Sequence, residues 1–143
     1  MTKSPIMGWL DDLKQSLFKT GANEPAAPCE ASPCEQSLHS ELNQAAANGT
    51  APVRYHMLFS GDVQGVGFRW TNQSIARKHN LSGWARNLPD GTVAVEIQGP
   101  PSAIARHLEL IHASYARTRN RIWLEEFIQL DANTSESDFD VHM

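Results

Sequence analysis

The chain contains only two cysteines, Cys29 and Cys34, and no apolar run that approaches the length of a membrane span. These absences argue against a disulfide-stabilised secreted domain and against a helical membrane protein. The N-terminus has no uninterrupted apolar segment, and Asp11 and Asp12 argue against a signal or transit peptide. We therefore expect a cytoplasmic protein that does not associate with membranes.

A strong excess of charge of one sign is also missing. The 143 residues include 12 basic and 16 acidic side chains, which give a formal net charge of −4. After Pro52 the two signs are nearly balanced, with 9 basic and 10 acidic residues. Domains that bind nucleic acid usually carry a basic stripe, and this chain has none. We expect a monomer that binds a small molecule and no nucleic acid.

The two cysteines and His39 are separated by four residues each, a spacing that a metal site could use. A structural zinc site needs four ligands, but the fourth is missing and the surrounding segment is polar. We therefore expect free thiols in a reducing compartment, with no metal and no cofactor.

The first 50 residues differ in composition from the rest and form an expected extension to a domain at 53–143. A short amphipathic helix is predicted over residues 5–19 by apolar residues at helical spacing, namely Ile6, Trp9, Leu10, Leu13 and Leu17. This helix either docks on an unknown partner or membrane surface, or it folds on its own domain or frays. The second interpretation is favoured because no basic cluster flanks the helix. Residues 21–33 indicate a linker and 37–47 a weak helix, so the extension should be mostly flexible.

From Val53 onward the apolar residues alternate at strand period or recur at helical period. The predicted elements are a strand at 53–60, a helix at 69–80, a strand at 81–87, a strand from Val93, a helix from Pro100 and Pro101, a strand at 122–130 and a short strand at 139–143. Glu126 breaks the alternation of its strand, which indicates a bulge or the sheet edge. The order β-α-β-β-α-β predicts an α+β ferredoxin-like sandwich, an antiparallel sheet with two helices on one face.

The most informative stretch runs from Gly61 to Arg69 and reads Gly-Asp-Val-Gln-Gly-Val-Gly-Phe-Arg. A glycine loop between a strand and a helix aims several backbone N–H groups at one point, where an anion can bind. Gly65 and Gly67 adopt positive φ at little cost, and the planar charge of Arg69 suits a phosphate. No lysine follows as in a Walker loop, and Trp70 replaces the third glycine of the dinucleotide fingerprint. We predict a phosphate cradle of another kind, with a plain connecting turn as the alternative.

This nonamer, followed by an aromatic residue, resembles the signature loop of the acylphosphatase family. A second block from Gly83 to Val93 is similar to the family's Gly-x-Val-x-Asn segment and the Asp-Gly turn after it, although Ala85 replaces the usual valine. The resemblance covers about residues 53–143. It implies a metal-independent hydrolase that cleaves the carboxyl–phosphate bond of acyl phosphates. By position, Arg69 would hold the phosphate and Asn87 the attacking water, with backbone amides from Val63, Gln64, Gly65, Val66, Gly67, Phe68 and Arg69.

Other residues are assigned ordinary roles. The histidines on predicted helices should lie on solvated surfaces, namely His79, His107 and His112. Three aromatic residues should pack in the domain or shape the pocket for the acyl group, namely Phe68, Trp70 and Trp84. Two other functions are compatible with the sequence. An RNA-binding module is suggested by the fold and by Gly65–Phe68, but the position in a loop and the near-neutral charge disfavour it. A regulatory role would have residues 1–50 recruit a partner.

Overall fold

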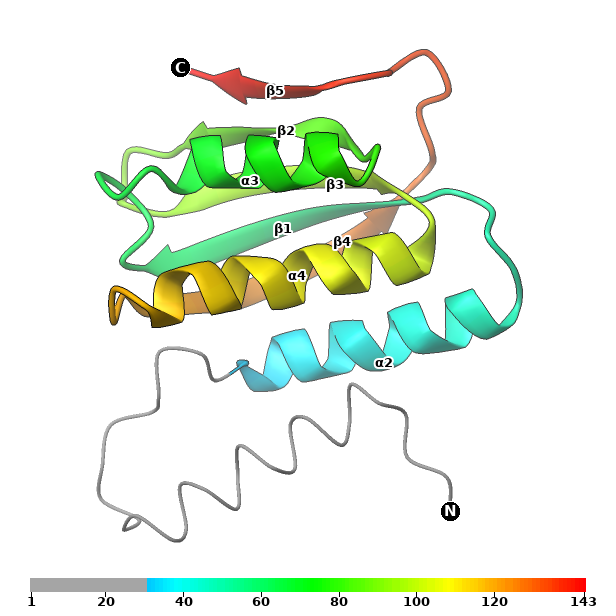
Figure 1. Ribbon diagram of the computed structural model, residues 1–143, viewed down its shortest axis with the longest axis horizontal. Helices are drawn as coiled ribbons and strands as arrows, with labels where there is room; N and C mark the ends of the chain where they lie inside the picture. Colours follow the sequence, from blue (N-terminus) through cyan, green and yellow to red (C-terminus); the bar gives the residue numbers. More distant parts are fainter. Residues whose placement is uncertain (1–30) are drawn as a thin grey trace, which may run out of the picture.

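The computed structural model describes residues 31–143, which form a five-stranded sheet with three helices packed beside it (Figure 1). The expected helix over 5–19 and Cys29 lie outside the described residues. The strands are β1 (Val53–Gly61), β2 (Ser82–Asn87), β3 (Val93–Gly99), β4 (Ile122–Leu130) and β5 (Phe139–His142). The helices are α2 (Pro33–Ala47), α3 (Phe68–Lys78) and α4 (Pro101–Ala116).

The strands lie in the order β4-β1-β3-β2-β5. β1 pairs antiparallel with β3 and β4, and β2 pairs antiparallel with β3. β5 runs parallel to β2, so the sheet is mixed at this one edge. The predicted ferredoxin-like succession of elements is confirmed. Because β1 and β2 both pair with β3, their ends lie on the two sides of that strand.

The alternating apolar residues of the strands lie on the face of the sheet that the helices cover. In β1, Tyr55, Met57 and Phe59 are buried at 1% exposure or less. The bulge expected in the fourth strand is present, because Leu58 pairs with Glu126 whereas Phe59 pairs with Leu124. β4 is also an edge strand, so both explanations for the break in its alternation apply.

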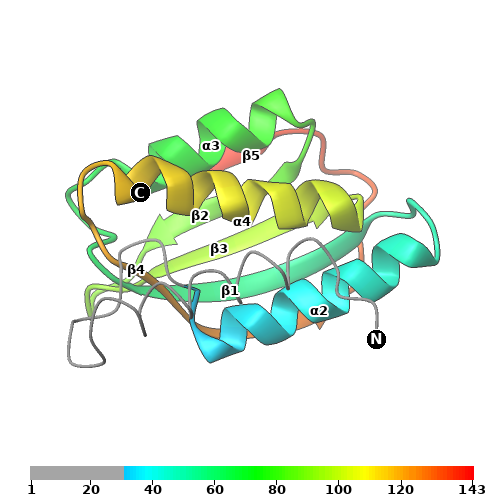
Figure 2. The same cartoon turned by 60° about the horizontal axis from the view of Figure 1, so that its bottom comes forward.

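The helices α3 and α4 lie side by side over the sheet (Figure 2). Pro101 lies in the first turn of α4, where backbone N–H groups make no hydrogen bond within the helix, so proline is tolerated there. The apolar face of α4 is buried as its period predicts, through Ile104, Leu108, Ile111 and Tyr115.

A third helix, α2, extends this layer beside α4 and over β4 (Figure 2). It is longer than the weak helix expected over 37–47, because Ser32 caps it by accepting from the Glu35 N–H at 3.0 Å. Leu38 and Leu42 are fully buried, and Glu41 accepts a hydrogen bond of 2.6 Å from the Tyr55 hydroxyl. The folded core therefore includes residues well before Val53.

Two histidines expected on solvated surfaces are buried, so that prediction is wrong for His107 and His112, which are 0% and 1% exposed. His107 Nε2 lies 2.9 Å from Asn72 Oδ1 on α3, and His112 Nε2 lies 2.8 Å from Glu35 Oε1 on α2. Burial, with a smaller contribution from His79, lowers the pKa of His107 to about 3, so this ring is neutral. The periodicity of α4 alone could not reveal these contacts, because they depend on the helices that cover its flanks.

The interface between α2 and α4 contains a buried carboxylate. Burial raises the pKa of Glu35, but the neighbouring His112 and His39 outweigh it and hold that pKa below its ordinary value. A carboxylate paired in this way stabilises the fold above its unfolded-state pKa and loses that contribution as the pH falls through the folded-state pKa.

We expect Leu38→Ala to lower the free energy of unfolding by about 2–5 kcal/mol, because it empties a fully buried site between α2 and the domain. The exposed Gln44 lies on the same helix and offers a matched control. Gln44→Ala should change stability by less than about 0.5 kcal/mol. Denaturant titration measures both, and equal small effects would show that α2 does not pack on the core.

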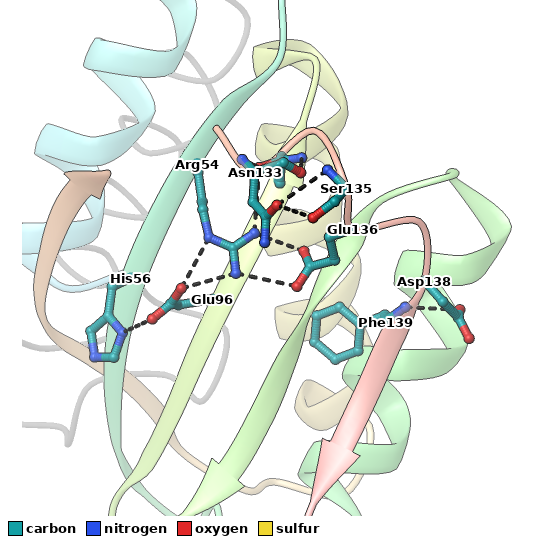
Figure 3. Close-up of polar contacts among 9 residues, drawn as sticks. Arg54, His56, Glu96, Asn133, Ser135, Glu136, Asp138 and Phe139 are labelled. Carbon is teal, nitrogen blue, oxygen red and sulfur yellow. Dashed lines mark hydrogen bonds and ion pairs between the residues drawn. The ribbon is translucent and has the colours of Figure 1, made fainter. Parts of the chain in front are cut away.

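The connection from β4 to β5 crosses one end of the sheet and is held by Arg54 (Figure 3). Arg54 is 5% exposed, and its guanidinium lies 2.7 Å from Glu136 Oε1 and 2.9 Å from Glu96 Oε1. Gln98 adds two hydrogen bonds to the backbone of Asn133. These contacts fix the start of β5, and the end of that strand then reaches the candidate site.

Candidate active site

The loop between β1 and α3 has the backbone conformation that its glycines predict. Gly65 and Gly67 have φ of 77° and 74°, in the left-handed region that side chains with a Cβ rarely adopt. A Cβ built at either position would meet no atom of the described chain within 4 Å, so backbone conformation rather than space requires glycine here. Gly67 is also the N-cap of α3 and provides no side-chain cap.

Most of the loop amides are open. Within residues 31–143, no group accepts a hydrogen bond from the N–H groups of residues 64–67. Phe68, Arg69 and Trp70 form the first turn of α3, where N–H groups have no helical partner. The Val63 N–H differs, since it donates to the Gly61 carbonyl at 3.0 Å and is used inside the loop. The open donors and the positive end of the helix dipole together favour an anion.

The Gln64 side chain holds this loop against the turn between β2 and β3. Its Nε2 donates to the carbonyl oxygens of Leu88 and Thr92 at 2.8 and 2.9 Å. This contact was not predicted, because the sequence shows a glutamine in the loop but not which carbonyls lie within its reach. It ties the loop to the segment that directly follows Asn87.

Arg69 is half-buried at the start of α3, and the end of β5 orients it. Its Nη1 donates to the His142 carbonyl at 2.7 Å. The His142 ring stacks on Trp84 of β2, with centroids 5.2 Å apart and planes 10° apart. The last strand therefore fixes the guanidinium through a backbone carbonyl, which leaves the remaining N–H donors of the fork for a ligand.

Asn87, the last residue of β2, presents an unpaired acceptor. Its Oδ1 is buried, and within the described part of the chain it has no hydrogen-bond partner. A buried carbonyl oxygen without a partner costs free energy, so such a group is expected to meet a ligand or a water molecule.

The loop, Arg69 and Asn87 line one pocket of about 220 Å³. Its lining residues are Val63, Gly65, Gly67, Phe68, Arg69, Trp70 and Asn87. The structure thus brings the two predicted catalytic side chains to the predicted loop, whereas Gln64 and Val66 do not line the pocket. Phe68 is 1% exposed and packs in the core, which also prevents it from stacking on an RNA base. Trp70, by contrast, is 56% exposed at the pocket.

Residues 31–143 contain no group of three or more His, Cys, Asp or Glu side chains placed to hold a metal ion. In the same residues, no helix has both the length and the apolar character needed to cross a membrane.

Comparisons with known proteins agree with this fold and pocket. The family model described as Acylphosphatase matches residues 55–141, and the chain belongs to this family. An acylphosphatase of Thermococcus kodakarensis is 54% identical over 52 residues, 36% of this chain and 57% of that protein. One from Nocardia farcinica is 42% identical over 76 residues, 53% of this chain and 76% of that protein. The match to the Thermococcus protein thus spans less than two thirds of that relative's length.

A solved structure supports the same assignment. The crystal structure of acylphosphatase from Bacillus subtilis aligns with a TM-score of 0.52 at 25% identity. The alignment covers 64% of this chain and 99% of that chain.

Proposed function

We propose that the protein hydrolyses acyl phosphates to a carboxylate and inorganic phosphate. The observation that carries this proposal is a pocket that the glycine loop, Arg69 and Asn87 line together. Family membership supports the same reaction. The cytoplasmic location and the monomeric state expected from the sequence stay predictions.

The phosphoryl group binds at the loop. Phosphoryl transfer depends mainly on positioning and on stabilising charge at the equatorial oxygens. The open amides of residues 64–70 and the Arg69 guanidinium provide donors for those oxygens. Each preorganised donor aimed at developing charge stabilises the transition state by about 3–4 kcal/mol.

Asn87 orients the nucleophile. Its amide does not titrate in water, so it does not act as a general base. Its side-chain amide lines the pocket, where it binds a water molecule and places that water in line with the scissile P–O bond. The water oxygen bonds to phosphorus, the P–O bond to the acyl group breaks, and the carboxylate leaves with the electron pair. A phosphate oxygen receives the proton of the water. The carboxylate is a weak base, so its departure needs little help from a general acid.

Release of phosphate from benzoyl phosphate by the purified 143-residue chain tests this proposal. We expect hydrolysis that EDTA does not change, because backbone amides and a guanidinium hold the charge in this mechanism. No hydrolysis by the folded protein, or hydrolysis lost on chelation, would contradict the proposal.

Trp70 is proposed to contact the acyl group, since its exposed ring lies beside the phosphate loop at the pocket. An aromatic ring packed on a second ring contributes about 0.5–1.5 kcal/mol beyond its buried area. Trp70→Ala should therefore raise KM for benzoyl phosphate about fivefold while changing KM for acetyl phosphate by less than about twofold. Trp123→Ala, on β4 and outside the pocket, is the matched control. Equal losses on both substrates would refute an acyl-contacting role.

A further inference from the structure

The phosphate loop is also held from the last turn of α4. The Tyr115 hydroxyl donates to the Val66 carbonyl at 3.0 Å, although the two residues are 49 positions apart. The same hydroxyl lies 3.0 Å from Thr71 Oγ1 on α3. A tyrosine hydroxyl has one hydrogen, so the Thr71 hydroxyl donates to Tyr115 while Tyr115 donates to the loop.

This contact acts on the peptide that joins Val66 to Gly67. The peptide is trans, as are all peptides of the described chain. In a planar trans peptide the C=O and N–H bonds point in opposite directions. Because Tyr115 binds the Val66 carbonyl on the core side, the Gly67 N–H must point away from it, and Gly67 lines the pocket.

The Tyr115 ring is well suited to hold this position. It is 5% exposed, and its ring lies 5.7 Å from that of Phe68, the first residue of α3. Burial raises the pKa of Tyr115 although the hydrogen bond from Thr71 partly opposes the rise. The hydroxyl therefore keeps its proton, and its ability to donate, throughout the neutral pH range.

We propose that Tyr115 is a positioning residue of the phosphate cradle, which aims the Gly67 amide at the phosphoryl group by holding the Val66 carbonyl. The inference rests on the proposed function, because it assumes that the loop amides bind phosphate. Tyr115 does not line the pocket and acts only through the loop backbone.

Tyr115→Phe tests this proposal because it removes the hydroxyl and keeps the ring. Tyr55→Phe is the matched control, since Tyr55 is also buried and its hydroxyl bonds Glu41 of α2, away from the loop. We expect Tyr115→Phe to raise the inhibition constant of inorganic phosphate, and to lower kcat/KM for benzoyl phosphate, about threefold to tenfold. Tyr55→Phe should leave both within about twofold of the wild type while lowering thermal stability. Thr71→Val, which removes only the donor that orients the hydroxyl, should act like Tyr115→Phe but more weakly.

Unchanged phosphate inhibition and kcat/KM in folded Tyr115→Phe would overturn the inference and leave the proposed function intact. Equal losses in Tyr115→Phe and Tyr55→Phe would also overturn it, since they would reflect general destabilisation. A wild type without hydrolysis or phosphate inhibition would remove the proposed function instead. In that case the amide NMR signals of Gly67 and Phe68 still decide the positioning role. A shift in Tyr115→Phe but not in Tyr55→Phe supports it, and identical signals refute it.

Discussion

Arg69→Gln should lower kcat/KM for benzoyl phosphate by about a thousandfold or more, with the fold retained. Arginine side chains that stabilise a transferring phosphoryl group contribute about 10³–10⁵ in rate. Glutamine keeps a polar side chain but removes the charge and the planar fork, so it cannot replace those donors. Steady-state kinetics, with circular dichroism to confirm folding, measures the effect.

Arg77→Gln is the matched control for this substitution. Arg77 lies on the same helix as Arg69 but is exposed, and it pairs with Asp138 at 2.9 Å rather than lining the pocket. Its loss should leave kcat/KM within about twofold, because an exposed ion pair contributes little. Arg69→Lys should recover only part of the lost rate, since lysine supplies charge without the fork. Full activity in Arg69→Gln would remove the guanidinium from the proposed mechanism.

Asn87→Ala should lower kcat by about a hundredfold or more while the inhibition constant of phosphate stays within about threefold. The asymmetry follows from the proposed role, because the amide touches the attacking water rather than the phosphoryl group. Comparing kcat with phosphate inhibition in the same preparation separates the two. A parallel loss of kcat and phosphate affinity would assign Asn87 to phosphate binding instead.

The stability of Asn87→Ala adds an independent test. A buried acceptor without a partner contributes nothing favourable to folding, so its removal should not reduce the free energy of unfolding by more than about 1 kcal/mol. Asn87→Asp keeps the size of the side chain but adds a negative charge beside the phosphate loop. This variant should weaken phosphate inhibition, whereas the alanine variant should not. A strongly destabilised alanine variant would indicate a structural role for the amide.

The helix α2 and the glycine loop are connected through α4. Glu35 of α2 binds His112, and Tyr115, one turn further along α4, binds the Val66 carbonyl. Tyr115 therefore holds the loop from a helix whose other flank α2 covers. Deleting residues 1–50 would remove part of the folded core, because the buried Leu38 and Leu42 would be lost and the surface that they cover would be exposed.

Local patterns were sufficient for the succession of elements and for the backbone conformation of the glycine loop. The alternation in β1, the bulge in β4 and the apolar face of α4 follow from side-chain periods that each strand or helix sets by itself. Gly65 and Gly67 have the positive φ expected of them because that preference belongs to the single residue. The resemblance of the loop and of the Asn87 segment to one family predicted the site residues, and Arg69 and Asn87 line one pocket with the loop.

Burial across elements could not be predicted in this way. His107 and His112 resemble surface residues on their own helix, and only the packing of α3 and α2 against α4 makes them core. The same holds for Gln64, whose reach to Leu88 and Thr92 depends on where the next turn lies.

The sequence by itself determined the order of strands and helices along the chain and the backbone conformation of the glycine loop. The tertiary structure alone decided which carbonyl orients Arg69, that Asn87 Oδ1 is left without a partner among the described residues, and that Tyr115 holds the loop. The physical reason is separation along the chain. Backbone preferences and side-chain periods act over a few residues, whereas each of these contacts joins segments far apart in sequence that only the folded sheet and helices bring together.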